Sequence, residues 1–128
     1  MNLEPSEAIV VLVAAANAEE AARLAEMLVG ARLAACVQIM PKMESVYRWK
    51  GKIERQAEVL LIAKTTKSEF AELERSVRAL HSYETPEIVA IPLTASSAPY
   101  LEWLLTSLDR HKAVKEANQK ALSQEAGG

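Results

Sequence analysis

The side chains best suited to bind a metal ion are few. His81 is one of two histidines, and Cys36 is the only cysteine among 128 residues. Imidazole suits copper, zinc and nickel, but one such ligand makes a weak site unless carboxylates such as Glu84 or Glu87 join it. Two structural roles compete with this chemistry. His81 is also suited to the C-terminus of a preceding helix, and Cys36 to a place as a small core residue in an apolar strand.

No motif of a known enzyme class accompanies these residues. The sequence contains neither a Gly-x-Ser-x-Gly elbow nor a His-Glu-x-x-His helix. It has only four glycines, and they form no glycine-rich phosphate loop. A His81–Glu84 pair is the one candidate for acid–base chemistry, and nothing beside it indicates a substrate. The sequence therefore predicts a protein that is not an enzyme.

Composition argues against two classes of partner. Half of the residues are apolar and a quarter are charged, with a formal net charge of -2. This is the balance of a globular domain, without a basic field to gather nucleic acid. No apolar run reaches the length of about 18 residues that spans a membrane. The N-terminus is acidic, unlike a secretory signal, and one cysteine forms no internal disulfide, so we expect a cytoplasmic protein.

The elements that must position these side chains follow from periodicity and capping signals. Residues 9–13 are apolar and β-branched without alternation, which predicts a central strand. Asn17 with Glu20 forms a capping-box pattern, and Thr66 with Glu69 repeats it, so each pair begins a predicted helix. Further strands are expected at 34–40, 45–49, 53–65 and 87–91, and a third helix at 97–108.

The order β-α-β-β-α-β with an appended C-terminal helix predicts an α+β fold of the ferredoxin-like type. In this plan four antiparallel strands form one sheet, and two helices cover one of its faces. We expect Gly30 to end the first helix and residues 1–111 to form a single domain. Residues 112–128 are mostly polar, which predicts a tail that is helical or frayed.

The middle hairpin is too long for its own core. Its arms run from Ala34 to Thr66, with a bend at Pro41 and a turn at Gly51, whereas a typical strand has about 5–6 residues. Its outer part carries side chains worth about 1.5–3 kcal/mol each on burial, namely Val46, Tyr47, Trp49 and Ile53. We therefore expect hairpins of neighbouring subunits to pair in a closed homo-oligomer. The alternative is a hairpin that folds back on its own sheet.

Five stretches, at residues 33–37, 45–54, 64–65, 81–87 and 100–104, resemble the signature stretches of one family in order and spacing. The sequence is similar to the CutA family of divalent-cation tolerance proteins over roughly residues 8–108. The resemblance implies a ferredoxin-like subunit, a homotrimer built through long β-hairpins, and tolerance to divalent cations such as copper. The nitrogen-regulatory PII signalling proteins share this subunit plan.

The resemblance also implies where a ligand binds. Family positions that gather in a cleft between subunits match Trp49, Lys64, Tyr83, Glu84 and Glu87 in this sequence, and we add Cys36 as a possible ligand or reactive thiol. These side chains suit a small anionic or zwitterionic ligand. They equally suit a polar network that locks subunits together.

Departures from the family pattern weaken the metal site. Copper-binding members use a cysteine on the first strand and a histidine pair before the Tyr-Glu loop, where this chain has Val13, Leu80 and His81. Ser82 stands where the family usually has proline, and Ser96 where it usually has glycine.

We expect a homotrimer that binds Cu2+ or another divalent cation weakly and does not need it to fold. The alternative is a PII-like sensor of a small molecule. Neither reading involves nucleic acid or a membrane.

Overall fold

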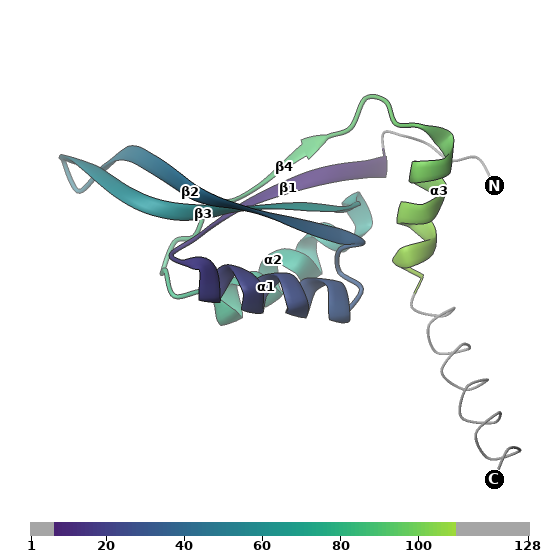
Figure 1. The fold of residues 1–128 in the computed structure, drawn as a ribbon, viewed down its shortest axis with the longest axis horizontal. Helices are drawn as coiled ribbons and strands as arrows, with labels where there is room; N and C mark the ends of the chain where they lie inside the picture. Colours follow the sequence, from purple (N-terminus) through teal and green to yellow (C-terminus); the bar gives the residue numbers. More distant parts are fainter. Residues whose placement is uncertain (1–6, 110–128) are drawn as a thin grey trace, which may run out of the picture.

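The computed structural model describes residues 7–109, so the predicted tail at 112–128 lies outside the described residues. In chain order the elements are β1 (Ala8–Ala15), α1 (Ala18–Gly30), β2 (Cys36–Trp49), β3 (Lys52–Thr66), the 3-10 turn η2 (Lys67–Glu69), α2 (Phe70–Leu80), β4 (Ile88–Pro92) and α3 (Ala98–Ser107). Figure 1 shows α1 and α2 beneath one sheet, with α3 at its end. The ferredoxin-like α+β prediction with an appended helix is confirmed.

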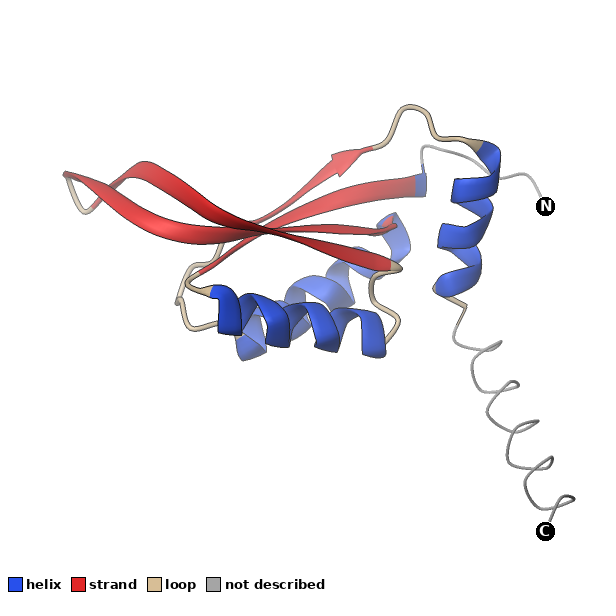
Figure 2. Cartoon of the chain, in the orientation of Figure 1, coloured by secondary structure: helices blue, strands red, loops and turns tan. Residues whose placement is uncertain are grey.

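The sheet has the strand order β2-β3-β1-β4, and both neighbours of β1 run antiparallel to it. β1 is therefore an inner strand, as its uninterrupted apolar run predicts, and lies between the edge strand β4 and β3 of the long hairpin (Figure 2). Ala15 pairs with Val59, and Val13 pairs with Ile88. The loop that enters β4 consequently reaches the sheet near residue 58 of β3.

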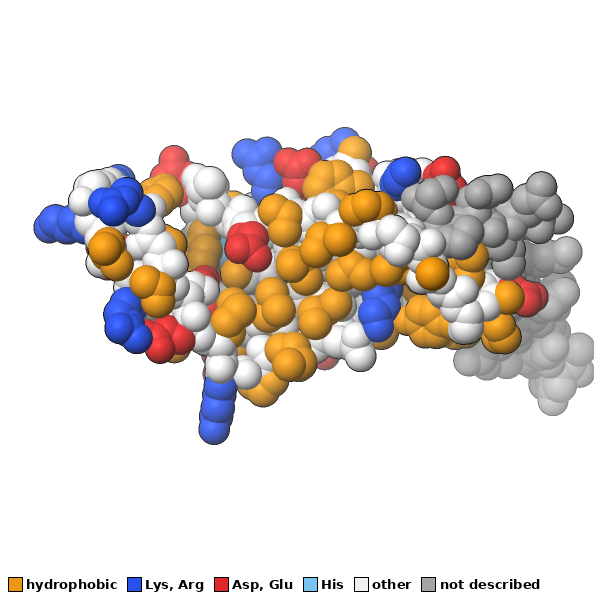
Figure 3. Space-filling view, turned by 90° about the horizontal axis from the view of Figure 1, so that it is seen from above, with side chains coloured by type: hydrophobic (Ala, Val, Ile, Leu, Met, Phe, Trp, Pro, Cys, Tyr) orange, Lys and Arg blue, Asp and Glu red, His pale blue; other side chains and the backbone are white. Residues whose placement is uncertain are grey.

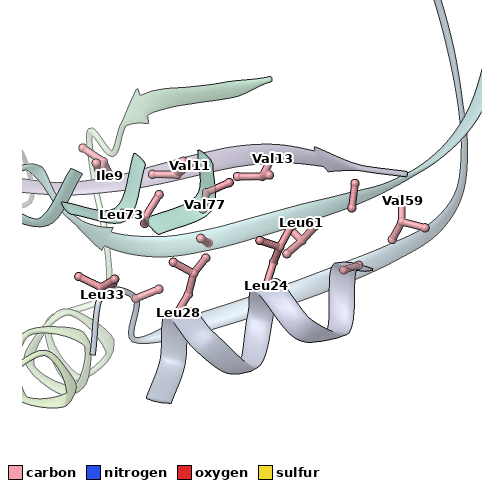
Figure 4. Packing of buried hydrophobic residues seen from close by; sticks show 14 residues of the cluster. Ile9, Val11, Val13, Leu24, Leu28, Leu33, Val59, Leu61, Leu73 and Val77 are labelled. Atoms are coloured by element: carbon pink, nitrogen blue, oxygen red, sulfur yellow. The ribbon is translucent and has the colours of Figure 1, made fainter. Parts of the chain in front are cut away.

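One hydrophobic core joins the sheet to the two helices beneath it (Figure 4). α1 contributes Leu24 and Leu28, and α2 contributes Leu73 and Val77, all of them fully buried. Each pair is separated by four residues, so its side chains lie on one face of the helix. They pack against strand side chains on the helix-facing side of the sheet, which are Ile9, Val11, Val13, Val59 and Leu61. Each burial is worth about 1.5–3 kcal/mol, so this layer fixes the helices on the sheet.

The two predicted capping boxes have different outcomes. Asn17 caps α1, because its Oδ1 accepts the N–H of Glu20 at 2.8 Å. Glu20 does not return the bond to Asn17, and its Oε1 accepts the N–H of Ala16 at 3.0 Å instead. The second box is wrong, since Thr66 makes no capping bond and the chain forms the 3-10 turn η2 before α2. The carboxylate of Glu20 thus bonds to the residue directly before the cap of α1.

α1 ends at Gly30 as predicted, but the left-handed residue that follows the helix is Arg32, with φ of 57°. Arg32 Nη1 donates a hydrogen bond of 2.8 Å to the carbonyl oxygen of Ser107, the last residue of α3. On its other side α3 buries Leu101 and Leu104 in a smaller cluster at the end of the sheet. This turn therefore anchors the appended helix to the βαβ unit.

β2 and β3 form a hairpin with arms of 14 and 15 residues. Lys50 and Gly51 have φ of 50° and 80°, as in the two-residue turn whose twist matches that of the strands. The predicted turn at Gly51 is confirmed. The outer part of the hairpin, residues 43–58, is called the ribbon below. It extends beyond both helices and does not fold back on its own sheet (Figures 1 and 2).

The predicted bend in the first arm is a β-bulge. The pairing of β2 with β3 shifts register between Met40 and Met43, and Lys42 between them has φ of 62°. One extra residue in β2 inverts the facing of every side chain beyond it. Tyr47 and Trp49, which have odd numbers, consequently lie on the same side of the hairpin as the even-numbered Met40.

The sheet face opposite α1 and α2, called the open face below, is largely apolar. Figure 3 looks onto this face and shows hydrophobic side chains gathered over its middle. Met40, Val89 and Ile91 lie on it and are 54%, 46% and 48% exposed. A contiguous exposed apolar area on a globular chain marks an interaction surface.

Candidate functional site

His81 follows α2, and its imidazole is fully buried against β1. Nε2 lies 2.7 Å from the carbonyl oxygen of Ala14, and Nδ1 lies 3.0 Å from the backbone nitrogen of Tyr83. Because the Tyr83 N–H donates to Nδ1, a neutral ring carries its proton on Nε2 and donates it to Ala14. His81 is the C-cap residue of α2, as predicted, but its imidazole joins the loop to β1 and does not bond to the end of the helix. In this geometry no lone pair of the neutral ring is left for a metal ion.

The carboxylate of Glu20 lies beside this ring and is almost completely buried. Its Oε1 accepts the N–H of Ala16, and its Oε2 accepts the N–H of Ser82 at 2.9 Å. His81 Nε2 is 3.6 Å from Oε1. Burial alone would raise the pKa of Glu20, but the hydrogen bonds from Ala16 and Ser82 and the charge of a protonated His81 outweigh it and lower the pKa. Glu20 is therefore a buried carboxylate held ionised by the loop.

Tyr83 extends the same loop towards the ribbon. Its hydroxyl donates to Glu58 Oε2 at 2.9 Å, and its ring lies 4.8 Å from that of His81 between centroids. Burial, followed by the hydrogen bond to Glu58, raises the pKa of the Tyr83 phenol. Glu58 itself is buried and directly follows the exposed residues 52–57 of β3. A chain of polar contacts thus runs from the first turn of α1 to the base of the ribbon.

Lys64 lies on the open face at the far end of β3 from the turn. Its Nζ donates to Gln38 Oε1 at 2.7 Å and lies 5.7 Å from the centre of the Tyr100 ring. Cys36 is its direct cross-strand neighbour and is half-buried, so the prediction that Cys36 is a core residue is only partly met. Tyr100 also packs against Trp103, which is 46% exposed. An ammonium, a thiol and two aromatic rings thus share one end of the open face.

The predicted cleft residues form separate groups within one protomer. Trp49 pairs with Lys52 beside the hairpin turn, and the strand from Lys52 to Lys64 spans about 40 Å at about 3.3 Å per residue. Tyr83 lies between these ends, at the level of Glu58. Residues from more than one copy of the chain are needed to bring Trp49 and Lys64 to a common site.

Glu84 and Glu87 are exposed in the loop before β4. Glu84 and Tyr83 line a shallow groove of about 620 Å³ along the outer side of α2. The two arginines of this groove already have carboxylate neighbours on the helix, with Arg75 2.7 Å from Glu72 and Arg78 3.7 Å from Glu74. The groove therefore presents balanced charge and does not select an anion.

Two residues of this region escape prediction from the sequence. Glu20 carries a signal, because its position three residues after Asn17 marks it as a capping glutamate, but the pattern does not reveal its bond to Ser82. Glu58 carries none, since it is an ordinary polar residue at the start of an apolar run. Among residues 7–109 no group of three or more His, Cys, Asp or Glu side chains is placed to hold a metal ion. The role of His81 as a metal ligand stays a prediction that these contacts do not favour.

Comparison with known proteins identifies the family. The family described as CutA1 divalent ion tolerance protein matches residues 9–107. The chain belongs to the CutA1 divalent ion tolerance family. No helix in the part described, residues 7–109, is long and apolar enough to cross a membrane.

Relatives of this CutA1 chain come from bacteria, archaea, plants and animals. The divalent-cation tolerance protein CutA of Thermus thermophilus is 46% identical over 95 residues, covering 74% of this chain and 92% of that protein. A solved structure from the same organism has a TM-score of 0.75 at 45% identity, covering 76% of this chain and 94% of that chain.

The names of two further relatives include a compartment. The chloroplastic protein CutA of Arabidopsis thaliana is 48% identical over 99 residues, which are 77% of this chain and 54% of that protein. The chain thus spans about half the length of the plant relative. The periplasmic divalent cation tolerance protein CutA of Archaeoglobus fulgidus has a solved structure with a TM-score of 0.78 at 39% identity, covering 80% of this chain and 99% of that chain.

Proposed function

We propose that the chain works as a homotrimer, without catalysis, in the tolerance of divalent cations such as copper. The observation that carries this proposal is the apolar surface of the ribbon. Val46 is 60% exposed, Tyr47 39%, Trp49 48% and Ile53 68%. Surfaces of this kind favour association, because each side chain buried is worth about 1.5–3 kcal/mol.

The exposed side chains lie on both sides of the ribbon. The cross-strand pairs of β2 with β3 place Val46 and Ile53 on one side and Tyr47 and Trp49 on the other. A hairpin that bent back onto its own sheet would cover only one of these sides. Insertion of the ribbon between elements of neighbouring copies covers both, which favours a closed ring of subunits over a monomer.

The open face supports the same assembly. Its exposed Met40, Val89 and Ile91 continue the apolar surface from the ribbon towards β4. A stable interface buries about 800 Å² per partner, which requires a broad surface and not one hairpin tip. The ribbon and the open face together supply that breadth.

The test is the molecular mass in solution. We expect sedimentation equilibrium and native mass spectrometry at micromolar concentration to give three copies per particle. Ile53→Lys should shift the particle towards monomer. Val29→Lys, at an apolar residue of α1 that is 44% exposed and far from the ribbon in sequence, is the matched control and should leave the mass unchanged. A monomeric parent protein would contradict the proposal.

The link to cations is proposed to involve weak binding that folding does not require. The family description supports a relation to divalent ions, and residues 7–109 contain no ready-made group of metal ligands. A ligand that binds only the folded state raises its melting temperature, whereas a weak one does so little. We expect removal of metal by a chelator to leave the melting temperature unchanged within about 1 °C. A large loss of stability would contradict this part of the proposal.

A small-molecule sensor of the PII type is the second candidate function. Lys64 favours it, since its ammonium lies on an apolar face and its partners within residues 7–109 are the neutral Gln38 and Tyr100. Covering that face with a second copy would bury a charge that needs an anion. We expect anionic metabolites to raise the melting temperature of the parent protein and not that of Lys64→Gln. Equal shifts of melting temperature in the two proteins would show that Lys64 does not bind the ligand.

We also propose that residues 1–111 act as one domain and that the protein works in the cytoplasm. The single free cysteine suits a reducing compartment. Limited proteolysis should release residues 112–128 before it cuts elsewhere, and cell fractionation should recover the protein in the cytoplasm. Recovery in another compartment would refute the placement.

A further inference from the structure

Three consecutive residues, His81, Ser82 and Tyr83, open the loop that carries the candidate cleft residues Tyr83, Glu84 and Glu87. The loop has no regular secondary structure between α2 and β4. Its conformation therefore depends on contacts that its first residues make with other elements. Three such contacts are formed, and they attach the loop to the end of β1, the first turn of α1 and β3.

The first contact is made by His81, whose ring bonds to Ala14 of β1 and accepts the N–H of Tyr83. The second is made by Ser82, whose N–H donates to Glu20 Oε2. The third is the hydroxyl of Tyr83, which donates to Glu58 of β3. The loop start is thereby attached to three separate elements within three residues.

We infer that Glu20 is a positioning residue for the candidate cleft, because its buried carboxylate clamps the loop start to α1 through Ser82 and His81. Its two oxygens make different contacts. Oε1 accepts the N–H of Ala16 and faces His81 Nε2 at 3.6 Å, while Oε2 holds Ser82. This inference rests on the proposed cleft for its functional meaning, but the clamp itself is a property of one protomer.

Ser82 is suited to this clamp in a way that proline is not. Its backbone N–H is the donor to Glu20 Oε2. Proline has no backbone N–H, so it could not supply this bond.

The test removes the clamp and follows Tyr83. Glu20→Ala deletes both acceptor oxygens, and Ser82→Pro deletes the donor while leaving Glu20 in place. We expect the Tyr83 amide to exchange with solvent about tenfold to 100-fold faster in each variant, as on loss of a hydrogen bond to a charged group. We also expect the Tyr83 phenol to ionise at lower pH, measured by tyrosinate absorbance in a background with Tyr47→Phe and Tyr100→Phe.

Asn17→Ala is the matched control. It removes the cap at the same end of α1, but it leaves Glu20 and Ser82 bonded. We expect both Tyr83 signals to stay at parent values in this variant. Equal changes in Asn17→Ala and Glu20→Ala would show that Glu20 only stabilises the helix, which overturns the inference. Parent-like Tyr83 signals in both clamp variants would overturn it as well.

The particle mass of each variant separates this inference from the proposed function. If the parent protein is a monomer and the variants show the expected Tyr83 changes, the homotrimer is refuted and the clamp is supported. If the parent protein is a trimer and the Tyr83 signals do not change in the Glu20 and Ser82 variants, the homotrimer is supported and the clamp is refuted.

Discussion

Replacing His81 by alanine distinguishes a buried structural histidine from a metal ligand. The substitution removes a ring that is fully buried and that bonds to Ala14 and Tyr83. The carbonyl of Ala14 and the N–H of Tyr83 then lose their partner in a site shielded from water. Each buried polar group left unsatisfied costs about 1–3 kcal/mol, so we expect unfolding free energy to fall by about 2–6 kcal/mol.

Two measurements on the His81→Ala variant distinguish the structural role of His81 from a role as metal ligand. Urea unfolding at fixed protein concentration reports the loss of stability, and the concentration must be fixed because assembly contributes to it. Copper titration by calorimetry reports metal binding. We expect His81→Ala to bind copper as the parent does. His111→Ala, at the other histidine, which lies outside the described residues, is the chemical control for loss of an imidazole.

One result would refute this reasoning. If His81→Ala lost copper binding while its unfolding free energy changed by less than about 0.5 kcal/mol, the ring would be a ligand and the contacts with Ala14 and Tyr83 would be incidental.

Three further predictions concern the fold around the site. Gly51→Ala should destabilise the hairpin by about 1–2 kcal/mol in urea unfolding, because Gly51 has φ of 80° and an L-residue resists that conformation. Thr65→Val should cost about 1–3 kcal/mol in the same assay, since the buried Thr65 hydroxyl donates to the Leu33 carbonyl at 2.7 Å. The pKa of Glu20 lies below its ordinary value in the folded state, so its contribution to stability is present above the unfolded pKa and is lost as pH falls through the folded pKa. Unfolding measured between about pH 6 and pH 3 should therefore show a shallower decline in stability for Glu20→Gln than for the parent.

The regular elements were predictable because their signals are local. The spacing of Leu24 and Leu28, or of Leu73 and Val77, shows a helix face without reference to the rest of the chain. The turn at Gly51 is equally local. The family resemblance rests on longer stretches and was confirmed over residues 9–107.

The site was predictable only in part because its bonds join residues far apart in sequence. Nothing near His81 indicates that its ring turns inwards to Ala14, and nothing near Glu20 indicates Ser82. Local patterns also failed where two structures compete for the same residues. Thr66 has the residues of a capping box around it, yet the chain takes a 3-10 turn there.

The single extra residue between Met40 and Met43 makes the length of this segment as important as its composition. Deleting one residue there would keep every hydrophobic side chain of the ribbon, yet it would rotate Tyr47 and Trp49 to the opposite side. A further deletion of one residue would restore their direction. This segment should therefore tolerate substitutions far more readily than the insertion or deletion of one residue. It should also tolerate the insertion or deletion of two residues more readily than that of one.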